Sequence, residues 1–328
     1  MRFINPKTDY AFKKIFGSDE SREILISFLN ALVYEGNPTI EDLTIINPNL
    51  PPKIEGLKDT YLDVKATLND GTIVIIEMQV LNVESFGKRV LFNAAKTYAL
   101  QLQAGEGYIC LKPLIALTLT DFEMFRDRDP FLSRFVYREK SNGFLYPDNE
   151  IELVFVELPK FSKKIDELET ITDKWIYFIK SAPSLETIPD NMEEIPELNR
   201  AFNIASEANL TREELENLDR QEMFIRDQQG IMRFGIREAR EKGLKEGREE
   251  GREEGREEGI LQKSREAILE VLQVRFEALP DELVETLNTI QDDAILTSLL
   301  RQGIQVDSIE DFQESLNSLN SPRESSNE

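Results

Sequence analysis

A turn between two apolar segments constrains this chain more than any other feature of its sequence. Residues 61–68 and 72–80 have the composition of strands, and Asn69-Asp70-Gly71 between them is a strong turn signal. The second segment, TIVIIEMQV, is apolar on both faces, which predicts a central strand covered on both sides. Such a strand needs further strands beside it and helices over both faces, so we expect an α/β fold.

Helical and strand patterns surround this hairpin. Helical patterns cover residues 9–16, 20–34 and 85–103, and buried strands are expected over residues 113–120 and 151–158. The proline-rich stretch 37–58 is expected to be an extended loop. This order predicts an α/β core over residues 1–160, a mixed central sheet flanked by helices, followed by a mostly helical C-terminal region.

Composition divides the chain after residue 160. Residues 161–240 are expected to form a helical extension that includes a proline-rich, acidic linker at 183–197. Residues 241–260 repeat Gly-Arg-Glu-Glu and form either a helix or a flexible linker, because each glycine costs about 1 kcal/mol relative to alanine in a helix. Residues 261–316 are expected to be a small helical module, and residues 317–328 a disordered tail.

The absence of histidine excludes several classes of active site. The chain has no histidine and a single cysteine, Cys110, which rules out serine–histidine and cysteine–histidine catalysis, an intrachain disulfide and the usual zinc sites. Any metal must be held by oxygen ligands, which favours Mg²⁺ or Mn²⁺. Cys110 itself lies in an apolar segment and is expected to be buried. Neither a signal peptide nor a membrane-spanning segment is evident, so we expect a cytoplasmic protein.

The net charge of −23 is unevenly distributed along the chain. Residues 1–120 carry 12 Lys and Arg against 14 Asp and Glu, so the other 208 residues carry 21 of the 23 net negative charges. A basic groove in the first third therefore remains compatible with DNA as a partner, while the acidic remainder repels phosphate at long range. We expect DNA binding to be weak and sensitive to salt.

The hairpin brings two carboxylates together. If Asn69-Asp70-Gly71 is a three-residue loop, residues whose numbers sum to 140 face each other, and Asp63 stands opposite Glu77. Gln79 then lies on the same face as Glu77. A two-residue turn would instead place Asp63 opposite Met78.

A divalent cation is the natural partner of such a pair. Two buried carboxylates repel each other, and Mg²⁺ between them removes that repulsion and takes its remaining ligands from water and phosphate. Glu77 in an otherwise apolar strand points to this arrangement. The alternative is structural: a carboxylate at a strand end can be exposed, and Asp63 can cap a loop.

The order of these residues resembles a known nuclease signature. Asp63, followed after thirteen residues by Glu77-Met78-Gln79, resembles the D…ExK motif of PD-(D/E)XK nucleases. The variant with glutamine last is similar to the recombination-promoting nuclease and transposase family (the Rpn group). Residues 9–17 (DYAFKKIFG) and the helix after the hairpin are similar to two flanking blocks of that family, the second through Arg89, Tyr98, Gln101 and residues 105–108.

The resemblance covers about residues 1–160 and implies a restriction-endonuclease-like core with Mg²⁺-dependent DNA endonuclease activity linked to recombination or transposition. It implies that Asp63 and Glu77 are metal ligands and catalytic residues, and that Gln79 takes the place of a catalytic lysine. Lysine brings a positive charge that glutamine lacks.

Other side chains near the motif are candidates for accessory roles. Lys65, Lys13 and Arg89 are candidates for a cation that replaces the missing charge, and the alternative for each is an ordinary surface charge. Asp9 is either a third acidic ligand or a helix N-cap. Tyr98 and Gln101 contact DNA, pack against the protein or are simply exposed to solvent.

Three functions remain open from the sequence. The first is a metal-dependent nuclease. The second is a catalytically weak or inactive relative that binds DNA or protein. The third is an assembly protein that forms a homo-oligomer through its C-terminal helical region, with the α/β core as a passive scaffold.

Overall fold

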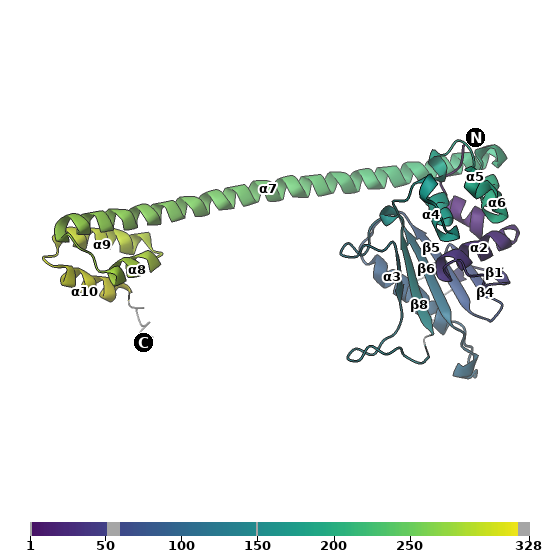
Figure 1. Ribbon diagram of the computed structural model, residues 1–328, viewed down its shortest axis with the longest axis horizontal. Coiled ribbons are helices and arrows are strands. Elements are labelled where there is room, and N and C mark those ends of the chain that lie inside the picture. The colour runs from purple at the N-terminus through teal and green to yellow at the C-terminus, as the bar shows by residue number, and fades with distance from the viewer. Residues whose placement is uncertain (1, 51–59, 149, 321–328) are drawn as a thin grey trace. The chain divides into compact units, whose positions relative to one another are not determined.

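The computed structural model describes residues 2–50, 60–148 and 150–320 (Figure 1). The chain divides into two compact units, residues 1–232 and residues 233–328. The first unit contains a mixed six-stranded sheet with helices on both faces, and the second is helical. The predicted α/β fold with a helical C-terminal region is therefore confirmed.

The predicted hairpin forms with the expected register. β4 (Val64–Leu68) pairs antiparallel with β5 (Ile73–Gln79), and Val64 lies opposite Ile76. Gly71 has φ +90°, a conformation that glycine adopts without strain, and the Thr72 N–H donates to the Asp70 carboxylate at 2.8 Å. The three-residue turn is confirmed, and the two-residue alternative is excluded.

The sheet has the strand order β1-β4-β5-β6-β8-β7. β6 (Leu114–Thr120) is buried along its whole length between β5 and β8 (Ile151–Glu157), and both pairings are parallel. Two edge strands, β1 (Leu43–Ile46) and β7 (Leu132–Phe135), were not expected. The prediction of a continuous loop over residues 37–58 was wrong in part, because Leu43–Ile46 pairs with β4 and β2 (Asn49–Leu50) pairs with the short strand at Thr60–Tyr61. Residues 51–58 of that stretch lie outside the described residues.

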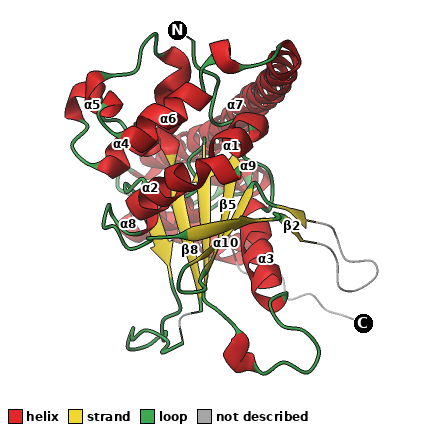
Figure 2. Cartoon of the chain, turned by 90° about the vertical axis from the view of Figure 1, so that its right-hand side faces the viewer, coloured by secondary structure: helices red, strands yellow, loops and turns green. Residues whose placement is uncertain are grey.

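Helices from both ends of the first unit cover one face of the sheet (Figures 1 and 2). They are α1 (Asp9–Phe16), α2 (Arg22–Val33), α4 (Ile171–Ser181) and α6 (Pro196–Ile204). Aromatic side chains form the centre of this core: Trp175 packs against Phe16 and Phe28, with ring centroids 5.9 and 5.5 Å apart. This core buries the even-numbered side chains of β4 and β5.

The proline-rich stretch 183–197 is part of this core and is not a linker. It contains α5 (Asp190–Glu193), and Met192 is fully buried in the same cluster as Phe12 and Trp175. An acidic, proline-rich sequence is compatible with a linker, but it is equally compatible with short helices that begin at prolines. The compact unit therefore continues well past residue 160.

Helix α3 (Phe86–Ala99) packs on the opposite face of the sheet (Figure 1). Ala94 lies in a small cluster with Ile75 and Ala116. Phe86 and Val90 pack against Phe155. This face is thinly covered, and it carries Glu77.

The Gly-Arg-Glu-Glu repeat lies within one continuous helix, α7 (Arg212–Phe276). The C-terminal unit packs the end of this helix with α8 (Asp281–Thr289), α9 (Asp293–Gln305) and α10 (Ile309–Asn320) around Leu272, Leu287 and Phe312. The tail predicted to begin at residue 317 is helical as far as Asn320, and residues 321–328 lie outside the described residues.

Two further expectations can be compared with the structure. Cys110 was expected to be buried but is exposed, because the apolar segment around it ends in a short surface 3₁₀ turn (Tyr108–Cys110) before β6. Within the part of the chain that the structure describes, no helix combines the length and apolar character that crossing a bilayer requires.

Candidate active site

Asp63 lies at a break between two strand segments. The short strand β3 (Thr60–Tyr61) ends before it, and β4 begins after it. Leu62 packs on the α3 face, whereas Val64 packs in the large core on the other face. Residues i and i+2 of a regular strand share a face, so the chain kinks at Asp63. The register brings position 63 beside β5, and the kink decides where the side chain points.

The Asp63 carboxylate is held by the backbone of β5 and by helix α1. Its Oδ2 accepts a hydrogen bond from the Met78 N–H at 2.7 Å, and its Oδ1 lies 3.6 Å from the Lys13 Nζ. Lys13 also pairs with Asp9 at 2.6 Å. Burial is the main cause that raises the pKa of Asp63, and the neighbouring Asp9 adds to it, while the Met78 N–H and Lys13 act in the opposite direction; the resulting pKa is about 7.

Asp9 stands in the first turn of α1, and its alternative role as N-cap was wrong. Thr8 is the N-cap, and its hydroxyl accepts a hydrogen bond from the Ala11 N–H. Asp9 is therefore free of the capping role and faces Asp63 and Lys13. The three side chains form a compact cluster of two carboxylates and one ammonium group.

Glu77 is held by helix α3, which packs on the face of the sheet opposite to α1. The Arg89 Nη2 donates to the Glu77 Oε1 at 2.6 Å and to the Gln79 Oε1 at 2.5 Å. The Asn93 Nδ2 donates to the other Glu77 oxygen at 3.4 Å. Arg89 and Asn93 are one helical turn apart, so the same face of α3 presents both to the strand.

The loop between β5 and α3 aims this helix face at the motif. Ser85 adopts a left-handed conformation, with φ +65°, directly before the helix begins. Its carbonyl accepts the Arg89 N–H at 3.1 Å, which closes the first helical turn. Gln79 is fixed from the same loop, because its Nε2 donates to the Leu81 carbonyl at 2.6 Å. The amide oxygen of Gln79 is thereby turned toward Arg89.

The arrangement therefore has two acidic groups, each with its own cation. Asp63 is paired with Lys13, and Glu77 with Arg89. Both carboxylates are largely buried, with side chains 13% and 16% exposed. Among the described residues, no hydrogen bond or ion pair joins Asp63 directly to Glu77.

Comparison with known families shows the family to which the chain belongs. The sequence profile of the family described as PD-(D/E)XK nuclease family transposase matches residues 6–234, more than two thirds of the chain. The chain belongs to this family. The resemblance predicted from the motif is confirmed, and so is the restriction-endonuclease-like fold class. No curated protein and no solved structure matched the chain in the corresponding searches.

Family membership implies a divalent cation, and the donors around the motif suit one. Asp63, Asp9 and Glu77 offer the hard carboxylate oxygens that Mg²⁺ and Mn²⁺ bind. One buried acceptor beside Glu77, the Asn93 Oδ1, has no hydrogen-bond partner among the described residues. The described residues contain no cluster of three acidic, histidine or cysteine side chains that forms a metal cage, but Mg²⁺ needs only one or two carboxylates.

Some side chains at this site were missed from the sequence. Asn93 is the clearest, and its signal is a polar residue four positions after Arg89 on the buried stripe of a helix. Asp121 directly follows β6; its N–H donates to the Gln79 carbonyl at 2.9 Å and its carboxylate pairs with Lys7 at 2.8 Å. Parallel strands bring Asp121 to the same edge of the sheet as Gln79, so its position after a buried strand was the available signal.

Three predicted accessory residues lie elsewhere. Lys65 pairs with Ile75 across the hairpin, and in the described chain no hydrogen bond or ion pair joins it to Asp63 or Glu77. Gln101 exchanges two 2.9 Å hydrogen bonds with the backbone of Lys112, which is a packing role. Tyr98 lies at the far end of α3, where its hydroxyl donates to Glu150 at 3.4 Å.

Proposed function

We propose that this protein is a divalent-metal-dependent DNA endonuclease that hydrolyses phosphodiester bonds. The observation that carries the proposal is the arrangement of the ExQ motif: Glu77 and Gln79 share Arg89, so the positive charge that glutamine lacks is supplied from α3. The family match supports the nuclease class, and the kinked position of Asp63 beside β5 supports the choice of acidic partner.

Asp63 and Glu77 are the proposed ligands, with Asp9 as a third carboxylate. When bound, Mg²⁺ or Mn²⁺ stabilises negative charge on the phosphate and lowers the pKa of a water molecule. A pKa near 7 leaves Asp63 partly protonated at neutral pH in the metal-free protein, so binding a cation there displaces a proton.

The remaining groups act on the DNA. Arg89 and Lys13 stand on the two sides of the motif and can donate to phosphate oxygens as charge builds up in the transition state. Gln79 holds Arg89 in place through its amide oxygen. Asn93 orients the second oxygen of Glu77. Hydrolysis places a water oxygen on phosphorus and breaks the bond to the leaving sugar oxygen, which takes up a proton.

Plasmid nicking tests the proposal. The wild-type protein is incubated with supercoiled DNA in Mg²⁺, in Mn²⁺ and in EDTA, alongside Asp63→Asn, Glu77→Gln and a matched control, Asp219→Ala, at an exposed position of α7. We expect nicking only with a metal ion and only in the wild type and the control. Nicking that persists in both motif variants would reject the assignment.

A second function is favoured by one observation. Arg89 already neutralises Glu77 and contacts its Oε1, so a cation and the guanidinium compete for the same oxygen. If Arg89 keeps this Glu77 oxygen and excludes the cation, the protein would bind DNA, or a protein partner, without cutting. It would retain labelled DNA in a gel-shift assay and leave plasmid intact in every metal tested. A link to recombination or transposition, a cytoplasmic location and self-association through the helical C-terminal region stay predictions.

A further inference from the structure

The chain between β7 and β8 forms a second, smaller hairpin at residues 137–146. Arg138 and Leu145 form an antiparallel bridge. The Tyr146 N–H donates to the Tyr137 carbonyl at 3.0 Å, and the Glu139 N–H donates to the Phe144 carbonyl at 2.8 Å. Tyr137 therefore faces Tyr146, and Glu139 faces Phe144. We call this segment the aromatic arm.

The tip of the aromatic arm is fixed by its own hydrogen bonds. The Glu139 carboxylate accepts the N–H groups of Ser141, at 2.9 Å, and of Asn142. Gly143 has φ +75° and its carbonyl accepts from the Arg138 guanidinium at 3.1 Å. These hydrogen bonds lie within the turn itself and hold its shape. They also engage the carboxylate of Glu139 within the turn.

Strand alternation places three aromatic rings on one face of the arm. Tyr137 lies opposite Tyr146, and Phe144 lies two residues before Tyr146 on the same strand, so all three side chains are on one face. They are 47%, 59% and 56% exposed, although each is large and apolar. Exposed aromatic residues gathered on a rigid scaffold mark a binding surface more often than a chance arrangement.

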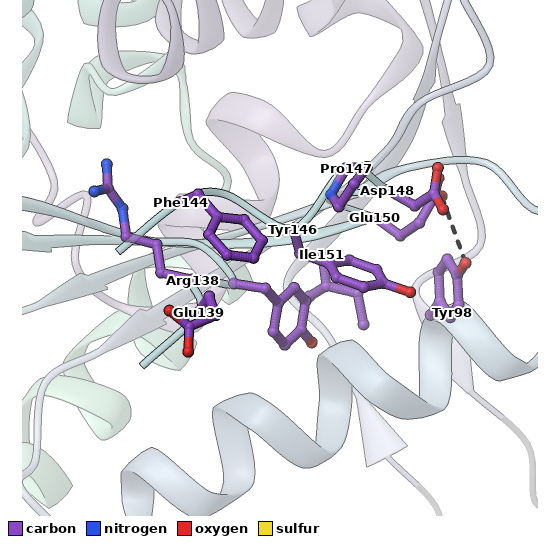
Figure 3. Close-up of a pocket in the computed structure, with 10 residues that line it drawn as sticks. Tyr98, Arg138, Glu139, Phe144, Tyr146, Pro147, Asp148, Glu150 and Ile151 are labelled. Atoms are coloured by element: carbon purple, nitrogen blue, oxygen red, sulfur yellow. Dashed lines mark hydrogen bonds between the residues drawn. The ribbon is translucent and has the colours of Figure 1, made fainter. Parts of the chain in front are cut away.

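These rings line a pocket of about 770 Å³ between the arm, the end of α3 and the start of β8 (Figure 3). Pockets of this size hold small organic ligands. Tyr98 of α3 and Ile151 of β8 also line the pocket. The Tyr98 hydroxyl is tied to the Glu150 carboxylate, so this part of the pocket is also fixed (Figure 3).

The polar groups of the pocket select the kind of ligand. Asp148 and Glu150 supply carboxylate acceptors on one side, and Arg138 lies at the other end (Figure 3). Carboxylates inside the pocket repel phosphate but accept hydrogen bonds from the amino groups of nucleobases. Aromatic faces stack on any base. A flat base that stacks on the rings with its amino edge toward these carboxylates matches both kinds of group.

We propose that this pocket binds an unpaired base of a DNA strand, so that the protein prefers substrates with a single-stranded segment. The proposal rests on DNA being the substrate, as the proposed function states. A paired base is stacked within the duplex and cannot enter, whereas an unpaired base exposes both of its faces.

The pocket is separate from the catalytic carboxylates. Arg89 and Tyr98 are nine residues apart on α3, which corresponds to about 14 Å along the helix axis. They also lie on opposite flanks of the helix, because nine residues make two and a half turns. Substitutions in the pocket can therefore change DNA binding without touching the residues proposed for cleavage.

Fluorescence anisotropy of a labelled oligonucleotide tests the pocket. The full chain is titrated in EDTA, so that no cleavage occurs, with a single strand and with the matching duplex. The variants are Phe144→Ala, Tyr146→Ala and Tyr146→Phe, and the control is Tyr108→Ala, an 84% exposed tyrosine that does not line the pocket. Circular dichroism melting confirms that each variant is folded.

We expect Tyr146→Ala and Phe144→Ala each to weaken single-strand binding about tenfold, the effect of losing one stacked base. Tyr146→Phe keeps the ring and retains the affinity, and duplex binding changes little. Wild-type affinity in both alanine variants, or an equal loss for duplex and single strand, would overturn the proposal.

The two proposals fail in different ways. If plasmid nicking is absent but the alanine variants still lose single-strand affinity, the nuclease assignment fails and the base pocket stands. If nicking depends on Asp63 and Glu77 but the alanine variants bind like the wild type, the base pocket fails and the nuclease assignment stands.

Discussion

Arg89 donates a 2.6 Å hydrogen bond to Glu77 from the helix that follows the hairpin. The same nitrogen reaches Gln79, so one guanidinium spans the acidic and the amide positions of the ExQ motif. A lysine at position 79 would place its charge in this region from the strand itself. In this protein the charge comes from α3, and Gln79 serves as its acceptor.

Removing the Arg89 guanidinium should slow DNA cleavage. We expect Arg89→Ala to lose about a hundredfold in single-turnover nicking rate, the usual effect of removing one donor to a developing charge. Arg89→Lys should lose less, because it keeps the charge but not the fork that contacts two residues. Arg248→Ala, at an exposed position of α7, is the matched control. An Arg89→Ala protein that cuts at the wild-type rate would show that the guanidinium is only structural.

The effect of replacing Gln79 with the lysine of the D…ExK motif should depend on Arg89. In the wild type, Gln79→Lys brings a second cation against Arg89, so we expect lower thermal stability and no gain in nicking. In the Arg89→Ala background the same change should restore part of the lost rate, because one cation near Glu77 suffices. The four proteins form a double-mutant cycle. Additive effects would contradict a shared role for positions 79 and 89.

The pKa of Asp63 predicts a pH dependence of stability. Burial, and then Asp9, raises this pKa from 3.8 to about 7, so the folded protein binds a proton that the unfolded chain has released. Binding of this proton by the folded state adds to the free energy of unfolding. The added stability is fully present below about pH 4 and is lost as the pH rises to about 7. In EDTA, we therefore expect the melting temperature of the wild type to fall relative to that of Asp63→Asn as the pH rises over that interval. A difference that stays constant with pH would contradict the raised pKa.

The helices after residue 160 should contribute to the stability of the nuclease fold. The Phe202 ring of α6 lies 5.1 Å from Phe3 and 4.7 Å from Phe178, measured between centroids. Phe202→Ala should lower the free energy of unfolding by about 3–5 kcal/mol. Urea unfolding followed by fluorescence of the single, buried Trp175 reports on this core directly. Glu194→Ala, at an exposed position, is the control, and an equal effect of the two substitutions would place Phe202 outside the core.

Local patterns predicted the centre of the fold correctly. The turn at Asn69-Asp70-Gly71 fixed the register of β4 and β5, and the apolar runs identified β5, β6 and β8 as buried strands. These elements are specified by neighbours within a few residues of each other. Edge strand β1 was missed because a strand of four residues carries too little periodicity.

The core of the first unit was only partly predictable. A proline-rich, acidic segment reads as a linker when it is considered alone. In the structure, Met192 of this segment is buried in the same hydrophobic cluster as residues of α1 and α2. That cluster joins positions more than 150 residues apart, and no local pattern encodes it.

The sequence by itself determined the register of the hairpin: spacing and turn chemistry brought position 63 beside β5 and put Glu77 and Gln79 on one face. Only the tertiary structure decided how they are held. The kink at Asp63 follows from Leu62 and Val64 packing on opposite faces of the sheet. The contact of Arg89 with Glu77 follows from the packing of α3. Strand register is a local property with a period of two residues, whereas side-chain direction at a kink and the reach of a neighbouring helix depend on contacts between distant parts of the chain.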